Sequence, residues 1–518
     1  MLYAIGAILV AYGLSMAAGW PQQWTGMIAD EGKNEAPQAA NDGASASHGN
    51  AHVEESTPAH KAEHPPYWMM LPFALLLLGI AVLPLIPWTA HWWESNLHRF
   101  YVAAGLGLLT LLYYLLLHGM PVASHWPVHA VVATNPAGPN YAVTWAVLVN
   151  ALVGEYLPFI VLLFTLYTIS GGIRIEGDLA AHPLTNSMFL TVGALLASFI
   201  GTTGAAMLLI RPLLETNRER KRVVHTVIFF IFIVCNCGGC LLPLGDPPLF
   251  LGYLRGVSFF WTMSLWPAWL VINGVLIAVY YVYDRFWHYP HETPRDIVLD
   301  EKTQSRLRIS GLWPNAFLLG GVVISVALLD PSQPLPGTNW HPWVFLREAV
   351  QLGLVGLSLL LGQEAVRRAN NFNYSAIIEV AALFLGIFIA MQPPLEILHV
   401  EGPNLGLHTP AQFFWATGSL SSVLDNAPTY VVFFETARTL GGEHLMPAGN
   451  GVDVALLTAV SLGAVFMGAM TYIGNGPNFM VKAIAEQSGV RMPSFFGYMI
   501  YSFLFLLPLF FVVTRLLL

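Results

Sequence analysis

Long apolar stretches, separated by short polar connections, follow one another along most of the chain. Twelve of them occupy residues 66–88, 100–118, 143–170, 183–213, 223–244, 259–283, 311–330, 344–362, 375–392, 409–434, 452–473 and 495–517. About 20 consecutive apolar residues are enough for a helix to cross the hydrocarbon core of a bilayer. The pattern therefore predicts an all-α polytopic membrane protein.

Two of these stretches, 183–213 and 409–434, are interrupted midway by residues that a continuous apolar helix would not carry. The interruptions read GTTG (residues 201–204) and LDNAPT (residues 424–429). Irregular backbone at membrane depth is tolerated only where protein or a water-lined cavity surrounds it. Each stretch is therefore predicted to form a re-entrant hairpin, in which two half-length helices meet at a polar tip and return to the same side.

The distribution of basic residues supports this topology. If ten stretches cross and the two hairpins do not, 16 of the 22 Lys and Arg residues lie on one side. Cytoplasmic loops carry such an excess. If the hairpins crossed as well, the basic clusters between Arg211 and Arg308 would move to the outside. The prediction is a multi-pass protein of a bacterial inner membrane, with residues 21–65 and the C-terminus in the periplasm.

The N-terminal part of the chain differs from the rest. Residues 1–20 are apolar but short for a span, and they fit an N-terminal anchor and a cleaved signal peptide equally well. Residues 21–65 are rich in Ala, Gly, Glu and His, which predicts a disordered, exposed segment.

The remainder of the chain divides into two repeats, 66–284 and 311–518, joined by a cytoplasmic linker at 285–310. The shift in numbering that places Glu155 on Glu379 also places Ser198 on Ser422, and a slightly longer shift places LGDPPLF (244–250) on IGNGPNF (473–479). Each repeat holds five spans and one hairpin, so the two have opposite orientations. Inverted repeats with interrupted helices are typical of transporters, and their binding site lies where the interruptions meet.

The amino-acid composition excludes several classes of protein. Hydrophobic residues make up 55% of the 518 residues and charged residues only 10%, with a net charge of −8. These values exclude a soluble enzyme and a nucleic-acid-binding protein. The three cysteines all lie within residues 235–240, which excludes a disulfide framework and favours tight packing over metal binding. No nucleophile–base constellation occurs in the spans, so an enzyme is the least favoured class, and no cofactor is expected.

Polar side chains at the hairpin tips and at two later helix breaks, CNCGGCLLPLGDPP (235–248) and TYIGNGPN (471–478), are the candidate ligands. Hydroxyl, amide and carboxylate oxygens beside freed backbone carbonyls are what a dehydrated sodium ion needs. The first set is Ser198, Thr202, Thr203, Asn236 and Asp246. The second set, predicted as the main cation site with sodium at Asp425 and Asn426, also contains Ser422, Thr429, Thr471 and Asn475.

Acidic residues inside the apolar stretches are costly unless they face a cavity and serve a function. Four stand out, namely Glu155, Asp246, Glu379 and Asp425, and no basic residue is expected mid-span beside them. A carboxylate can hold a proton or a cation in turn, which is the basis of antiport. Asp425, Glu155 and Glu379 are the proton-carrying candidates, although structural hydrogen bonds would also explain the two glutamates.

Three segments, GTTGAAMLLIRPLLETN (201–217), LGDPPLFLGYLRGVSFFW (244–261) and SSVLDNAPTYVVFFETA (421–437), resemble the sodium:proton antiporter branch of the ion transporter superfamily, which is also labelled citrate-transporter-like. The resemblance covers about residues 66–518. It implies a scaffold, a mobile transport domain that moves like an elevator, and a homodimer.

The tips depart from the dicarboxylate carriers of that superfamily, which have Ser-Asn-Thr at both positions. Here the second tip carries the acid Asp425, which opposes an anionic substrate. The expectation is a sodium/proton antiporter in the lipid bilayer. The alternatives are a carrier of citrate or another organic anion, and an ion-translocating subunit of a larger membrane complex.

Overall fold

The computed structural model describes residues 1–29, 64–124, 126, 130–293, 304–442 and 451–517. The described residues form a helical bundle, and each of the twelve predicted stretches is helical. By length and composition, five helical runs among these residues could cross a membrane, and three bent helix pairs bring the number to eight. Other stretches contain shorter apolar helices, such as α14 (Leu312–Leu328), so length alone undercounts the elements of this broken-helix architecture.

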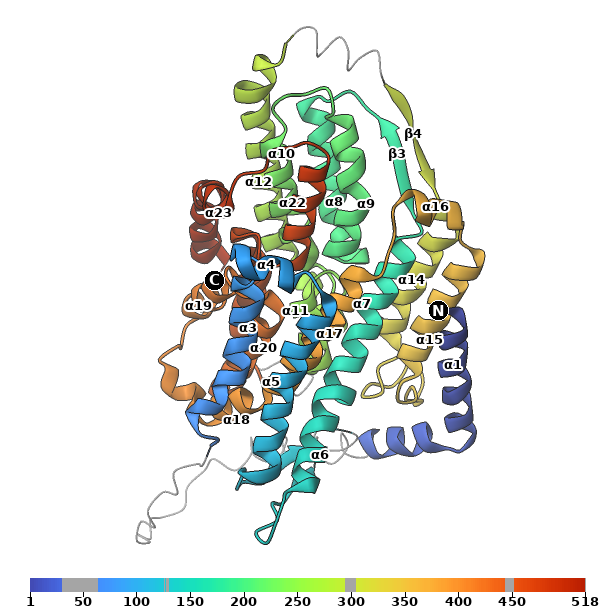
Figure 1. Ribbon diagram of the computed structural model, residues 1–518, viewed down its shortest axis with the longest axis vertical. Coiled ribbons are helices and arrows are strands. Elements are labelled where there is room, and N and C mark those ends of the chain that lie inside the picture. The colour runs from blue at the N-terminus through green and yellow to red at the C-terminus, as the bar shows by residue number, and fades with distance from the viewer. Residues whose placement is uncertain (30–63, 125, 127–129, 294–303, 443–450, 518) are drawn as a thin grey trace.

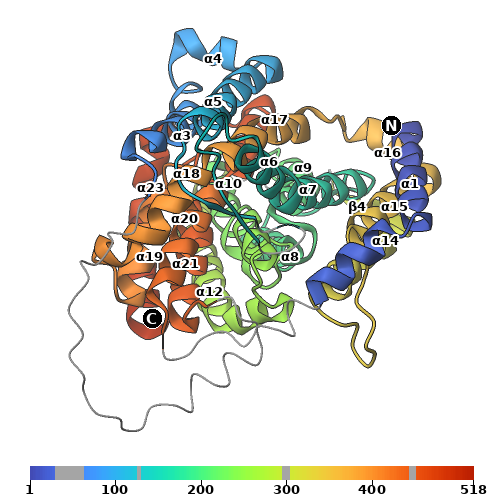
Figure 2. The same ribbon diagram turned by 90° about the horizontal axis from the view of Figure 1, so that it is seen from below.

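One group of helices, here called the frame, forms a row along one side of the bundle, with α1 (Leu2–Ala17) at one end of the row (Figures 1 and 2). The frame consists of α3 (Leu71–Val82), α5 (Asn96–Leu116), α6 (Tyr141–Val149), α7 (Leu157–Ser170), α14, α15 (Leu346–Leu361) and α17 (Ser375–Ala390). These helices pack in a series, with α5 against α17, α7 against α15 and α14 against α15.

The second group, here called the hairpin unit, contains both interrupted stretches and both breaks. Its helices are α8 (Pro183–Ile200), α9 (Thr202–Thr216), α10 (Val224–Ile233), α11 (Pro247–Leu254), α12 (Trp266–Tyr283), α19 (Pro410–Ser421), α20 (Asn426–Leu440), α21 (Val454–Met467), α22 (Gly476–Gln487) and α23 (Phe495–Leu517). Helices from the two repeats pack on each other, α9 against α22 and α11 against α20.

Both interrupted stretches fold back as predicted, and they enter the bundle from opposite ends. α8 and α9 descend from one end and α19 and α20 rise from the other (Figure 1). The first pair reverses direction at Gly201, whose φ of +80° is a left-handed conformation that favours glycine. This opposite entry is the structural form of the inverted repeat.

Matching close contacts at the two breaks show the same repeat in detail. A methyl group added to Gly245 would lie 2.1 Å from the carbonyl oxygen of Gly239, and one added to Gly474 would lie 2.6 Å from that of Gly468. The repeat shift that places residues 244–250 on 473–479 also places Gly239 on Gly468 and Gly245 on Gly474. Only glycine fits where two backbones approach so closely, which explains the glycines in both breaks.

Serines near the two hairpin turns bond to later helices of their own repeats. Ser198 donates from Oγ to the carbonyl of Gly238, at 2.6 Å, and Ser421 donates to the carbonyl of Ala464, at 2.7 Å. Ser422, which the repeat shift places on Ser198, instead donates to the carbonyl of Ser419.

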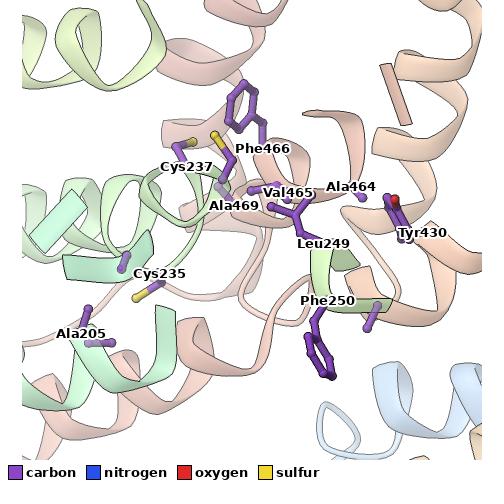
Figure 3. Packing of buried hydrophobic residues seen from close by; sticks show 14 of the residues in the cluster. Ala205, Cys235, Cys237, Leu249, Phe250, Tyr430, Ala464, Val465, Phe466 and Ala469 are labelled. Atoms are coloured by element: carbon purple, nitrogen blue, oxygen red, sulfur yellow. The ribbon is translucent and has the colours of Figure 1, made fainter. Parts of the chain in front are cut away.

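The core of the hairpin unit is built from small and apolar residues around the breaks. Cys237 from the first break lies near Phe466 and Ala469, Cys235 lies near Ala205, and Leu249 lies near Val465 (Figure 3). The three cysteines are free and fully buried. The described residues contain no group of three or more His, Cys, Asp or Glu arranged to hold a metal ion.

Two short antiparallel ribbons add strands that an all-α prediction does not contain. β1 (Val122–Ser124) pairs with β2 (Ala130–Val132), and β3 (Arg174–Asp178) pairs with β4 (Ser305–Ser310). In the second ribbon Glu176 lies opposite Arg308, and opposite charges across a strand pair stabilise it. Because β3 leads from α7 into α8 and β4 leads into α14, this ribbon ties together two connections between the frame and the hairpin unit.

The remaining short elements lie at the ends and connections of the bundle. They are α4 (Pro87–Trp93), α16 (Glu364–Ala369), α18 (Gln392–Glu401), the 3-10 segments Tyr67–Met70, Cys237–Cys240, Phe259–Leu265, Tyr289–His291, Gly402–Leu405 and Gly468–Met470, and the π-helical segments Asn150–Tyr156 and Asp284–His288.

The prediction of a disordered segment from residue 21 is wrong for residues 21–29. Residues 20–29 form a helix bent by 68° from α1, and α1 packs against α15 of the frame. The hydroxyl of Thr25 accepts a hydrogen bond from the backbone N–H of Val344 at 3.0 Å, which holds this helix in place. Residues 30–63, the rest of that prediction, lie outside the described residues.

Candidate functional site

Four half-length helices begin at one place in the middle of the hairpin unit. α9 begins at Thr202 and α20 at Asn426, which are the two hairpin tips, while α11 follows Asp246 and α22 follows Asn475, which are the two breaks. Unpaired backbone N–H groups and a positive dipole end characterise every helix start. The fold therefore collects four such starts around a common centre.

Asp246 occupies that centre and contacts both tips and the second break. Its Oδ1 accepts from the Thr202 hydroxyl at 3.0 Å and from Asn475 Nδ2 at 3.1 Å, and its Oδ2 accepts from Asn426 Nδ2 at 2.7 Å. Its side chain is buried, with a residue exposure of 1%. One carboxylate thus links both repeats.

An amide network extends the site to the first break. Asn475 Nδ2 also donates to the carbonyl of Cys235 at 3.0 Å and lies 3.3 Å from Asn236 Oδ1. Asn236 Nδ2 donates to Asn478 Oδ1 at 2.8 Å, and Asn478 donates in turn to the carbonyls of Gly468 and Thr471. The two predicted sets of ligands therefore meet in one connected network rather than in two separate sites.

Asp425 lies at the second tip. Its Oδ1 accepts from the backbone N–H of Ala427 at 3.0 Å and so caps α20, while its carbonyl accepts from the Thr429 hydroxyl at 2.9 Å. Asp425 is only partly buried, unlike its neighbour Asn426. The acid therefore stands beside the network and not within it.

Other predicted ligands hold the local backbone in place. Ser198 bonds to the first break, and Thr471 donates from its hydroxyl to the carbonyl of Ser422 at 2.5 Å, which joins the second break to the second tip. Thr203 is partly exposed. Ser421, which was not predicted, belongs to these contacts as well, because its hydroxyl donates to the carbonyl of Ala464, and so does Asn478.

The expectation that Glu155 and Glu379 lack basic partners is wrong. Glu155 Oε1 lies 2.7 Å from Arg255 Nη2, and Glu379 Oε2 lies 2.7 Å from Arg99 Nη1. The sequence places both arginines at the ends of apolar stretches, where the long guanidinium side chain can reach inward. Neither glutamate has a hydrogen bond to the Asp246 network in the described part of the chain.

A polar site with opposed hairpins and broken helices, inside an all-α polytopic bundle built from inverted repeats, defines the class of membrane transporters. The chain belongs to the family described as "Putative citrate transport", whose model matches residues 62–136 and 122–518. A comparison with curated proteins found no match.

Proposed function

We propose that this protein is a secondary transporter that exchanges sodium ions for protons. The observation that carries the proposal is the environment of Asp246, a buried carboxylate held by three neutral side chains. No ion pair to Asp246 occurs among the residues that the structure describes. A buried acid without a basic partner favours a bound cation or a bound proton as its counter-charge.

The donors around Asp246 leave oxygen atoms available to a cation. Asn426 Oδ1 is buried and has no hydrogen-bond partner within the described residues. It belongs to the same side chain whose Nδ2 contacts Asp246 Oδ2. Carboxylate and amide oxygens are ligands of hard cations, so Asp246, Asn426 and the nearby Asp425 supply a suitable set.

Exchange follows from competition at these acids. Sodium and a proton cannot neutralise the same carboxylate at once, so binding of one releases the other. Asp246 and Asp425 are the residues to which we assign this competition, and Thr202 and Asn475 position Asp246. The hairpin unit would carry the site past the frame in an elevator-like step. Glu379 receives no role in the exchange, because its partner Arg99 holds it within the frame.

Transport of citrate or another organic anion is the second candidate, and one observation favours it. The four helix starts around Asp246 provide a positive potential that suits an anion. Against this, Asp246 already occupies that potential, and Asp425 adds a second acid beside it. A citrate anion would have to approach both carboxylates.

Purified protein in liposomes distinguishes these functions. With a pH-sensitive dye trapped inside, an imposed sodium gradient is expected to drive proton movement, whereas citrate alone is not. Lithium and potassium tested in the same way define the ion preference. Citrate uptake without sodium-driven proton movement would contradict the proposal, and activity of the protein alone excludes a function that requires a larger complex.

Asp425→Asn is expected to weaken sodium binding without disturbing the fold. Asparagine caps a helix as well as aspartate does, so α20 keeps its capping bond. Removing one charge from the cation's surroundings is expected to cost about 1.5 kcal/mol, which raises the sodium concentration for half-maximal exchange roughly 10-fold. Undiminished exchange at low sodium in these liposomes would remove Asp425 from the site.

A further inference from the structure

Arg255 lies at the end of α11 between two carboxylates from different parts of the molecule. Its Nη2 lies 2.7 Å from Glu155 Oε1, and its Nε lies 3.3 Å from Glu435 Oε1. Only 8% of the Arg255 side chain is exposed. The Asp246 network does not include this cluster.

The two carboxylates that contact Arg255 belong to different groups of helices. The boundary between the hairpin unit and the frame runs between them. Glu435 lies on α20, which packs against α11 within the hairpin unit, so Arg255 and Glu435 belong to one body. Glu155 lies on the π-helical segment Asn150–Tyr156 of the frame, which packs against α6, α7 and α17. The Glu155–Arg255 pair therefore crosses from the frame to the hairpin unit.

Two buried polar atoms of this cluster lack a hydrogen-bond partner among the described residues. Arg255 Nη1 and Glu155 Oε2 are both buried and make no hydrogen bond within the described part of the chain. The further charged or titratable groups around them are Arg438, which lies 3.2 Å from Glu435, and the Tyr430 phenol. If the boundary slides, Arg255 keeps Glu435, but Glu155 loses the charged partner that it has here.

We propose that the Glu155–Arg255 ion pair locks the hairpin unit to the frame, and that the lock opens when the Glu155 carboxylate takes up a proton. The inference rests on the proposed exchange function, because it assumes that the hairpin unit moves. A proton from the aqueous phase, which the 21% exposed side chain of Glu155 can reach, forms the O–H bond on Glu155, and Arg255 remains charged and paired with Glu435. Glu155 is thus a positioning residue that makes movement depend on protons.

The repeat supplies an internal comparison. Glu379 occupies the corresponding position in the second repeat and has the same 2.7 Å pairing, but its partner Arg99 lies on α5, beside α17 in the frame. That pair joins two helices of one body and can persist during sliding. The same residue type at the same repeat position therefore has a different consequence for movement.

The test compares Glu155→Gln with Glu379→Gln in the full chain, reconstituted in liposomes and assayed for sodium-driven proton movement across a pH series. The introduced glutamine mimics the protonated acid, so the alkaline limb of the Glu155→Gln rate profile is expected to move up by about one pH unit or more. The Glu379→Gln profile is expected to keep the wild-type alkaline limb. An unshifted limb in Glu155→Gln, or equal shifts in both variants, would overturn the lock.

A second measurement separates failure of the lock from failure of the exchange function. Amide hydrogen exchange on the same preparations reports opening of α11 and of residues 150–156 and requires no transport. Faster exchange in both segments for Glu155→Gln, and not for Glu379→Gln, supports the lock even if no sodium-driven proton movement is seen. Arg255→Lys, which retains a positive charge, is expected to keep the alkaline limb of the wild type, and a variant that does not would count against an ionic lock.

Discussion

Asp246→Asn is expected to reduce sodium-driven proton movement to the level of empty liposomes. The substitution removes the charge that attracts a cation and the oxygen that would carry a proton, so both halves of the exchange are lost. A charge-assisted contact contributes about 1.5–3 kcal/mol, which alone corresponds to a roughly 10- to 100-fold loss of cation affinity. Binding of radioactive sodium to the purified variant measures that loss directly.

Asp453→Asn is the matched control. Asp453 caps α21 by accepting hydrogen bonds from the backbone N–H groups of Ala455 and Leu456, and asparagine performs this role equally well. Exchange at the wild-type rate is expected. Sodium binding by Asp246→Asn with unchanged affinity would show that the cation site lies elsewhere.

Gly245→Ala is expected to be the most destabilising single-methyl change in the hairpin unit. The added carbon would lie 2.1 Å from the carbonyl oxygen of Gly239 and 3.0 Å from Cα of Ser198, and both obstacles are backbone atoms that cannot rotate away. Overpacking of this kind costs about 1–3 kcal/mol or more. Thermal unfolding in detergent is the measurement.

Gly274→Ala provides the comparison, because nothing lies within 4 Å of the position that its methyl group would take on α12. Alanine stabilises a helix by up to about 1 kcal/mol relative to glycine, so this variant should unfold at the same or a higher temperature. Equal unfolding temperatures for the two variants would mean that the crossing at Gly245 and Gly239 is looser than the structure shows.

The architecture could be predicted from the sequence because each of its elements leaves a local signal. Hydrophobic length marks the spans, and GTTG and LDNAPT mark the hairpin tips. Charge asymmetry and the repeat shift then set their relative directions. The strands β3 and β4 escaped prediction because they pair across two connections that are far apart in the chain. The contact of Ser421 with the carbonyl of Ala464 escaped because it depends on how α19 packs against α21.

The individual residues of the site were predicted more completely than their relationships. Asp246 and Asn475 are recognisable as polar residues in helix breaks, but nothing local indicates that one carboxylate contacts both hairpin tips. The partners of Glu155 and Glu379 also depend on tertiary packing. Several helices separate Arg255 from Glu155 along the chain, and Arg99 belongs to a different repeat from Glu379. Charge pairs of this kind become visible only when the helices are placed together.

The acid in the second tip has a kinetic consequence for the proposed exchange. Asp425 lies on one side of the approximate two-fold relationship between the repeats, and the first tip, GTTG, has no acid. Under the proposed function, the conformations open to the two faces of the membrane would therefore not be mirror images, and the cation would meet a different charge on each route. Such an asymmetry would make transport faster in one direction than in the other. The ion distribution at equilibrium would still be set by the ion gradients alone.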